Sequence, residues 1–257
     1  MKKRFFVFYC MVLPMLLNAQ KGKNETLNIV FIGNSITYGA LLQHPALEAP
    51  PVQTKWWLQQ HTPLSAVNIS NQGVSGLTTV DFLPESQSYF KNVLSAANTL
   101  RKNTKGTLLF SIMLGTNDSA IKGPNGSPVS PLQYHTNLKR IIDELLSLYP
   151  HSILVLHRPI WYSPNTYNGA MYLKEGLRRL TRYLPQLKAL VNDYRVSHPN
   201  RVFMGDTKAF DYYKKNYRTT FTPEKGNAGT FYLHPNKTGA TKLGEFWGKA
   251  IYNVIQK

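Results

Sequence analysis

The feature that most constrains the fold of this chain is a series of short, uninterrupted apolar segments that are rich in β-branched residues. Continuous apolar runs, unlike alternating ones, are typical of strands that are buried on both faces. Such strands occur in parallel sheets with helices on either side. The sequence therefore predicts five strands of one parallel sheet, over residues 27–32, 66–69, 107–114, 153–156 and 201–204.

The segments between these runs have the spacing of helices. The last segment has the clearest pattern, an apolar stripe from Leu243 to Val254 that Asn236 or Thr238 can cap at its start. Alternating strands and helices predict a three-layer α/β/α sandwich, in which ligands bind at the carboxyl ends of the strands. The other expected helices cover residues 51–60, 80–100, 132–148 and 170–196, the second broken near Pro84 and the fourth kinked or divided at Pro185.

The first twenty residues have the organisation of a secretory signal peptide. Three bases, Lys2, Lys3 and Arg4, precede an apolar run over residues 5–17, and a small, polar stretch ends at Gln20. The alternative, a membrane anchor, requires about 20 apolar residues. We therefore expect cleavage near Ala19-Gln20, export to the periplasm or the medium, and one domain over residues 21–257 without an integral membrane segment.

The charge and cysteine content exclude several functions. Lys and Arg number 30 against 13 Asp and Glu, a net charge of +17, and removal of three bases with the leader leaves +14. The bases are scattered and accompany no DNA-binding motif, so nucleic acid is not an expected partner, whereas an acidic ester substrate is compatible with this charge. The one cysteine, Cys10, lies in the leader. Because the histidines lack metal-ligand spacing and no phosphate-binding loop occurs, we expect no metal and no cofactor.

Polar or glycine-rich blocks follow three of the predicted strands, and a fourth precedes the last helix. Taken alone, Ser35 could be a helix cap, Gly73 a turn residue and Asn117 a cap or turn residue. Their shared position, at strand ends that meet along one edge of a sheet, favours a common site instead. The blocks are Gly33-Asn34-Ser35, Asn71-Gln72-Gly73-Val74-Ser75-Gly76, Gly115-Thr116-Asn117-Asp118 and Leu233-His234-Pro235-Asn236.

The order and spacing of these blocks resemble the SGNH (GDSL-like) hydrolase family over about residues 27–256. The resemblance implies a flavodoxin-like fold with Ser35 as nucleophile and His234 as general base. It also implies an oxyanion hole formed by the backbone N–H groups of Ser35 and Gly73 and by the side-chain amide of Asn117. These roles suit acyl transfer, in which a base activates a hydroxyl and preorganised donors stabilise the developing oxyanion.

One position departs from the family pattern. The family has an aspartate three residues before the histidine, where this chain has Phe231. The imidazole could instead be oriented by a backbone carbonyl near Phe231, or by a distant acid such as Asp206 or Glu224, or the site could be impaired. We favour the carbonyl, which would leave a Ser-His dyad, and we expect Asp206 to cap a strand end.

The loop after the fourth predicted strand provides candidate substrate contacts. Arg158 could bind a carboxylate, and Trp161 and Tyr162 could stack on sugar rings. The alternative is that these side chains anchor a buried loop. Residues 121–131, rich in Gly, Pro and Ser, are expected to form a surface loop at the rim of the cleft.

The functional hypothesis is hydrolysis of a short-chain ester, in particular an acetyl ester, through an acyl-Ser35 intermediate. The resemblance to exported members of the family points to an O-acetylated carbohydrate, either a glycan or sialic acid. Two alternatives stay open: a lysophospholipase or thioesterase with the same fold, and a catalytically impaired glycan-binding protein. The oligomeric state is not predicted.

Overall fold

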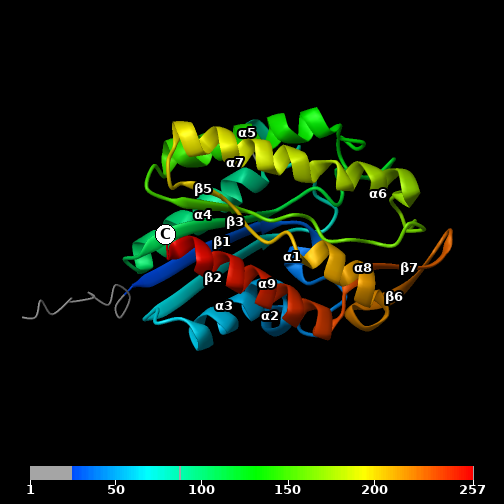
Figure 1. Ribbon diagram of the computed structural model, residues 1–257, viewed down its shortest axis with the longest axis horizontal. Coiled ribbons are helices and arrows are strands. Elements are labelled where there is room, and N and C mark those ends of the chain that lie inside the picture. The colour runs from blue at the N-terminus through cyan, green and yellow to red at the C-terminus, as the bar shows by residue number, and fades with distance from the viewer. Residues whose placement is uncertain (1–24, 87, 257) are drawn as a thin grey trace, which may run out of the picture.

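The computed structural model describes residues 25–86 and 88–256 and shows the expected parallel sheet. All neighbouring strands are parallel, in the order β2-β1-β3-β4-β5 (Figure 1). The predicted signal peptide lies outside the described residues. The strands are β1 (Thr26–Gly33), β2 (Ala66–Gly73), β3 (Thr107–Met113), β4 (Ile153–Leu156) and β5 (Val202–Met204).

Helices cover both faces of the sheet, which confirms the three-layer α/β/α architecture. One face carries α3 (Pro50–His61) and α9 (Lys237–Ile255), which pack against each other (Figure 1). The other carries α4 (Tyr89–Asn103), α5 (Pro131–Leu148) and α7 (Tyr183–Ser197). In the described part of the chain no helix is both long enough and apolar enough to cross a membrane.

Local sequence signals explain where several helices begin. Ser130 accepts a hydrogen bond from the N–H of Gln133, and Pro131 is the first residue of α5. The segment 170–196 is divided at Arg182, between α6 (Leu173–Thr181) and α7, and not at Pro185. Pro185 lies in the first turn of α7, where a missing N–H removes no intrahelical hydrogen bond. The predicted break near Pro84 is a 3-10 turn, η1 (Pro84–Ser86), ahead of α4.

The sequence analysis did not predict the secondary structure of the segment between β5 and α9. This segment forms α8 (Ala209–Thr220) and then an antiparallel hairpin of β6 (Phe221–Gly226) and β7 (Gly229–Pro235), separate from the main sheet. A strand that contains Pro223, followed by a tight turn at Asn227-Ala228, has the composition of a loop. Two short helices, α1 (Ser35–Tyr38) and α2 (Pro45–Glu48), were also not predicted.

The glycines of α9 determine how closely this helix approaches α3. A Cβ atom at position 244 would lie 2.3 Å from the Cβ atom of Gln53, and one at position 248 would lie 2.5 Å from the Trp57 ring. Neither glycine has a positive φ, so the constraint is space. The close approach lets Trp247 reach the sheet, where its ring stacks on that of Phe31 at 5.8 Å.

We predict that Gly244→Ala lowers the free energy of unfolding by about 1–3 kcal/mol because the helices must separate. Alanine is the better helix former by about 1 kcal/mol, so helix propensity alone would raise stability. Urea denaturation followed by circular dichroism measures the change. Asn253→Ala, on the exposed side of the same helix, is the control and should leave stability unchanged or slightly raised. Equal stability of the Gly244→Ala variant and the wild type would contradict the packing argument.

Candidate active site

Ser35 lies at the junction between the central strand β1 and helix α1. Asn34 caps this helix, since its Oδ1 accepts a hydrogen bond from the N–H of Ile36 at 3.1 Å. Ser35 is thus the first residue of α1, and its backbone N–H has no acceptor within the helix. Its side chain is largely buried but reaches the cleft described below.

His234 and Glu224 lie on neighbouring strands of the hairpin and complete a hydrogen-bonded chain with Ser35. The Nε2 atom of His234 is 3.0 Å from the Ser35 Oγ atom, and its Nδ1 atom is 3.0 Å from both carboxylate oxygens of Glu224. The Glu224 side chain is 15% exposed and that of His234 is 12% exposed. These three side chains have the hydrogen-bond pattern of a nucleophile–base–acid triad.

The carboxylate determines which imidazole nitrogen carries the proton. An ionised carboxylate only accepts hydrogen bonds, so Nδ1 must be the donor to Glu224. In the neutral imidazole, Nε2 is then an acceptor, and the Ser35 hydroxyl donates to it. This tautomer is the one that can receive the serine proton during nucleophilic attack.

This arrangement corrects the expected source of the orienting group. The acceptor at Nδ1 is the carboxylate of Glu224 and not the backbone carbonyl of Phe231. The pairing of β6 with β7 explains the difference, because it brings Glu224, which pairs with Phe231, close enough for its side chain to reach the imidazole of His234. The Asp206 carboxylate accepts from the N–H groups of Lys208 and Ala209 and so caps the start of α8.

The loop that precedes α6 fixes the hairpin to the body of the protein. Ser163 and Tyr232 exchange two hydrogen bonds, from Ser163 N–H to the Tyr232 carbonyl and from Tyr232 N–H to the Ser163 hydroxyl. Near the hairpin turn, the Asn165 side chain donates to two backbone carbonyls, those of Ala228 and Thr230. These contacts determine where the acid and the base lie relative to Ser35.

Asn117 follows β3, and contacts at both of its amide atoms hold its side chain. Its Nδ2 atom donates to the carbonyl of Leu77 at 2.8 Å, and its Oδ1 atom accepts from the Tyr172 hydroxyl at 2.7 Å. Burial raises the pKa of Tyr172, so its phenol is a neutral donor. The Tyr172 contact therefore determines which end of the amide is nitrogen, and one hydrogen of Nδ2 is left for another acceptor. Sequence reasoning did not identify Tyr172.

Gly73, the glycine expected in the oxyanion hole, does not line the cleft, whereas a second glycine three residues along the chain does. The N–H of Gly73 donates to Oδ1 of Asn71 at 2.9 Å, and Gly73 is not among the residues that line the cleft. Gly76 does line it, has a φ of +83°, and forms no hydrogen bond through its N–H within the described residues. A left-handed φ favours glycine at this position. The N–H of Gly76, unlike that of Gly73, is free to donate to a group bound in the cleft.

The predicted substrate contacts of the β4 loop do not reach the cleft. Trp161 is 7% exposed and packs against Tyr217 and Phe221. Tyr162 is fully buried and shares a hydrogen bond with Ser119. Arg158 lies over the ring of Phe210 at 3.7 Å. The alternative interpretation, that these side chains anchor a buried loop, is the one the structure bears out.

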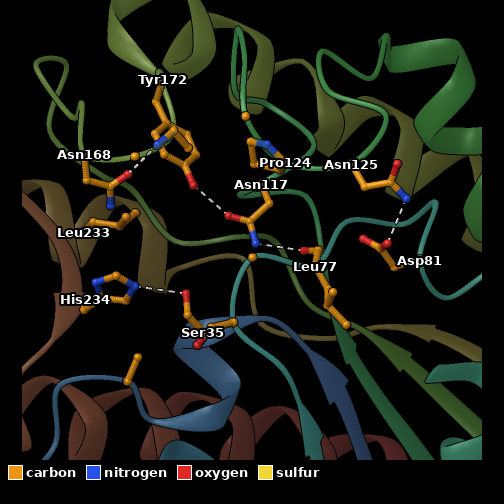
Figure 2. Close-up of a pocket in the computed structure, with 16 residues that line it drawn as sticks. Ser35, Leu77, Asp81, Asn117, Pro124, Asn125, Asn168, Tyr172, Leu233 and His234 are labelled. Atoms are coloured by element: carbon orange, nitrogen blue, oxygen red, sulfur yellow. Dashed lines mark hydrogen bonds between the residues drawn. The ribbon is translucent and has the colours of Figure 1, made fainter. Parts of the chain in front are cut away.

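The triad opens onto a cleft of about 570 Å³ at the carboxyl ends of β1, β2 and β3. This volume lies in the usual range of ~300–1,000 Å³ for small-molecule sites. Figure 2 shows His234 and Asn168 on one side of Ser35 and Asn117, and Asp81 and Asn125 on the other. The expected rim loop is confirmed, since it contributes Gly123, Pro124 and Asn125. The remaining lining residues are Ala40, Ser75, Gly76, Leu77, Gly169, Ala170, Tyr172 and Leu233.

A sequence model of the GDSL-like lipase/acylhydrolase family matches residues 31–242, a span that includes Ser35, Asn117 and His234. The chain belongs to this family. It is therefore a carboxylic ester hydrolase, consistent with the arrangement of its serine, histidine and glutamate. Among curated protein sequences, none matches this acylhydrolase at a significant level.

Solved structures similar to this acylhydrolase share its fold at low sequence identity. A carbohydrate acetylesterase from Sinorhizobium meliloti has a TM-score of 0.59 at 17% identity, covering 88% of this chain and 99% of its own. An acetylxylan esterase from Geobacillus stearothermophilus has a TM-score of 0.59 at 19% identity, with 92% and 96% covered. An aryl esterase from M. smegmatis has a TM-score of 0.56 at 15% identity, with 89% and 98% covered.

Asp118, next to Asn117, is a buried acid that anchors the cleft wall. Its Oδ1 atom accepts from the N–H and the hydroxyl of Thr79, and Asn137 donates to the same hydroxyl. Its Oδ2 atom has no partner within the described residues. Burial raises the pKa of Asp118 from an ordinary 3.8 to about 6. Because Thr79 lies two residues after Leu77, this anchor helps to hold the carbonyl that binds Asn117.

We predict that the stability contributed by Asp118 falls as pH rises from about 4 to about 6. The folded protein binds the Asp118 proton more tightly than the unfolded chain does, so this contribution is fully present below pH 3.8 and is lost as pH passes the folded pKa of about 6. Asp118→Asn keeps an acceptor for Thr79 without the buried charge. Its stability relative to the wild type should therefore increase over this interval.

Urea denaturation at pH 4, 5, 6, 7 and 8 measures this difference. Asp211→Asn removes the charge of a side chain that is 77% exposed and is the control for the loss of a surface charge. A difference between Asp118→Asn and the wild type that stays constant from pH 4 to pH 8 would show that Asp118 has the same affinity for protons in both states.

Proposed function

We propose that this acylhydrolase is a serine esterase that removes short acyl groups, in particular acetyl, through a covalent acyl-Ser35 intermediate. The observation that carries the proposal is the hydrogen-bonded chain Ser35–His234–Glu224, with 3.0 Å at each step, at the edge of a cleft. A serine hydroxyl is a weak nucleophile until an adjacent base can accept its proton. His234 is in position to do so, and Glu224 holds the imidazole in the required tautomer.

In the first half of the reaction, the Ser35 oxygen attacks the ester carbonyl carbon while its proton moves to Nε2 of His234. The imidazolium then protonates the leaving alcohol as the tetrahedral intermediate collapses to the acyl enzyme. In the second half, water takes the place of the serine hydroxyl and gives its proton to His234, and Ser35 is regenerated. Glu224 stabilises the imidazolium in both halves through its hydrogen bond to Nδ1.

We propose an oxyanion hole formed by the backbone N–H groups of Ser35 and Gly76 and by Nδ2 of Asn117. Ser35 begins a helix, Gly76 has an unused N–H in a left-handed turn, and Asn117 keeps one amide hydrogen free. All three residues line the same cleft. Donors fixed before the reaction stabilise the negative charge without having to reorganise during it.

The lining of the cleft favours short acyl groups over long ones. A long acyl chain needs a continuous apolar surface to leave water. Here polar side chains stand on both sides of the cleft, with Asp81 and Asn125 on one and Asn168 on the other (Figure 2). This arrangement argues against the alternative of a lysophospholipase or a long-chain thioesterase.

A carbohydrate ester is the substrate class that we propose, such as an O-acetylated glycan or O-acetylated sialic acid. Two structures of similar fold are described as a carbohydrate acetylesterase and an acetylxylan esterase. Side chains that both donate and accept hydrogen bonds line the cleft and suit the hydroxyl groups of sugars. We also propose that the chain is exported, because its first twenty residues have the pattern of a signal peptide.

We predict that the protein lacking residues 1–20 releases acetate from O-acetylated glycans and hydrolyses 4-nitrophenyl acetate faster than the butyrate-to-palmitate esters. Ser35→Ala and His234→Ala should each lower kcat by at least about a thousandfold, because the triad acts as a unit. Asn117→Ala should lower it by about 10²–10³-fold through the loss of one oxyanion donor. Acetate assay and absorbance at 400 nm measure the two reactions.

Each alternative predicts a different result in the same experiment. Highest activity with the palmitate ester would favour the lipid or thioester substrate. Glycan binding without turnover of any ester would favour the glycan-binding protein. Turnover that survives Ser35→Ala would disprove the assignment of the nucleophile.

We predict that Glu224→Gln lowers kcat/KM for 4-nitrophenyl acetate by about 10²–10⁴-fold, because the imidazolium loses its anionic partner. Asp206→Asn, which keeps an oxygen to cap α8, is the matched control and should change kcat/KM by no more than about twofold. If Glu224→Gln remained fully active, a group other than this carboxylate, such as a backbone carbonyl, would have to orient His234.

A further inference from the structure

Asp81 is the one acidic side chain among the described residues that line the cleft. It lies on the side of the cleft away from His234 (Figure 2). Its Oδ2 atom accepts from the N–H of Thr78 at 2.8 Å and shares the single hydrogen of the Thr78 hydroxyl, at 3.1 Å, with the backbone carbonyl of Asn125, at 2.9 Å. Its Oδ1 atom accepts from Nδ2 of Asn125 at 2.8 Å. Three hydrogen bonds therefore fix the carboxylate in one orientation.

These contacts leave hydrogen-bonding positions unused on both Asp81 and Asn125. A carboxylate offers about four acceptor positions, so Asp81 retains one for an incoming hydroxyl. Asn125 uses one of its two Nδ2 hydrogens, and its Oδ1 atom accepts no hydrogen bond from the described residues, since the contact from Thr78 goes to the backbone carbonyl. Asp81 and Asn125 thus present an acceptor and a donor side by side. Adjacent hydroxyls of a sugar need this combination, because each hydroxyl both donates and accepts.

The charge of the cleft differs in sign from that of the whole chain. The chain carries +17, but no lysine or arginine is among the described residues that line the cleft. Lys122, which precedes three lining residues, is exposed and is not one of them. Because salt screens exposed charges beyond about 8 Å, a ligand in the cleft is affected by Asp81 far more than by the distant basic surface.

We propose that Asp81 and Asn125 bind the alcohol side of the ester and select neutral, hydroxyl-rich groups over anionic ones. This inference rests on the proposed esterase function and narrows its substrate class to neutral sugar esters. A carboxylate-bearing sugar, such as sialic acid, would lie near Asp81 without a cation in the lining to bind it. Rejection by an unpaired like charge is an effective source of specificity.

The test compares three acetate esters: an O-acetylated xylo-oligosaccharide, which is neutral, an O-acetylated N-acetylneuraminic acid, which is anionic, and 4-nitrophenyl acetate, which has no hydroxyl group. The enzymes are the wild type, Asp81→Asn, Asn125→Ala and Asp193→Asn. Asp81→Asn keeps an oxygen that can accept from Thr78 N–H, removes the charge, and places an amide NH2 group where Oδ1 accepts from Asn125. Asp193→Asn makes the same change at a side chain that is 66% exposed and outside the cleft.

The wild type should prefer the neutral sugar ester to the anionic one by at least about tenfold in kcat/KM. Asp81→Asn should reduce this preference by about tenfold, by raising KM for the neutral ester and lowering it for the anionic one. Asn125→Ala should raise KM for the neutral ester about fivefold, the usual effect of one lost hydrogen bond. Both variants should stay within about twofold of the wild type on 4-nitrophenyl acetate, and Asp193→Asn should match the wild type on all three esters.

Three results would overturn the proposal: equal wild-type activity on the two sugar esters, an unchanged preference in Asp81→Asn, or an equal loss on all three esters in both cleft variants. Wild-type activity on 4-nitrophenyl acetate without activity on either sugar ester would also overturn it, while leaving the esterase function intact. Failure of the wild type on every ester would instead contradict the proposed function itself.

Discussion

The active site depends on the parallel pairing of one strand, β1, with a neighbour on each side. Gly33, the last residue of β1, pairs with Gly73 of β2 and with Met113 of β3. Because all three strands run in the same direction and end at the same level, the turns that follow them must converge. Ser35, Gly76 and Asn117 are carried by these three turns. In this fold the chain reverses its direction of travel across the sheet at β1, where a crevice forms.

A network of hydrogen bonds fixes the polar groups around this crevice. Asp118 holds Thr79, the neighbouring Leu77 carbonyl binds the Asn117 amide, and Tyr172 binds the other end of that amide. Each group in this series is buried or nearly so, and each has a partner that determines its orientation. An oxyanion donor must be oriented before the charge develops, so a buried amide that is held at both ends and keeps one hydrogen free is better suited to this task than a mobile side chain.

The sequence predicted the parts of the fold and site that depend on local patterns. Continuous apolar runs identified the strands, and polar blocks at their ends identified Ser35, Asn117 and His234. Glu224 could not be assigned from position alone, because its approach to His234 depends on pairing between two strands that resemble loops. Gly73 was expected in the oxyanion hole from the family resemblance, although two glycines in one turn look equivalent until φ and hydrogen bonding are known. Trp161 and Tyr162 were candidates both for substrate contacts and for a buried loop anchor, because large aromatic side chains suit either role until their burial is known.

The hairpin has a mechanical consequence. The proposed acid and base lie on the two strands of the hairpin, β6 and β7, and are hydrogen-bonded to each other, whereas the proposed nucleophile and oxyanion donors follow strands of the main sheet. The proposed catalytic groups thus lie on two structural units, joined at the site by the hydrogen bond between Ser35 and His234 and connected outside it through Ser163 and Asn165. A small displacement of the hairpin would carry Glu224 and His234 together, changing the distance to the serine while leaving the imidazole correctly oriented. Changes in the loop around Ser163, outside the cleft, can therefore alter nucleophile activation without touching the substrate or any catalytic side chain.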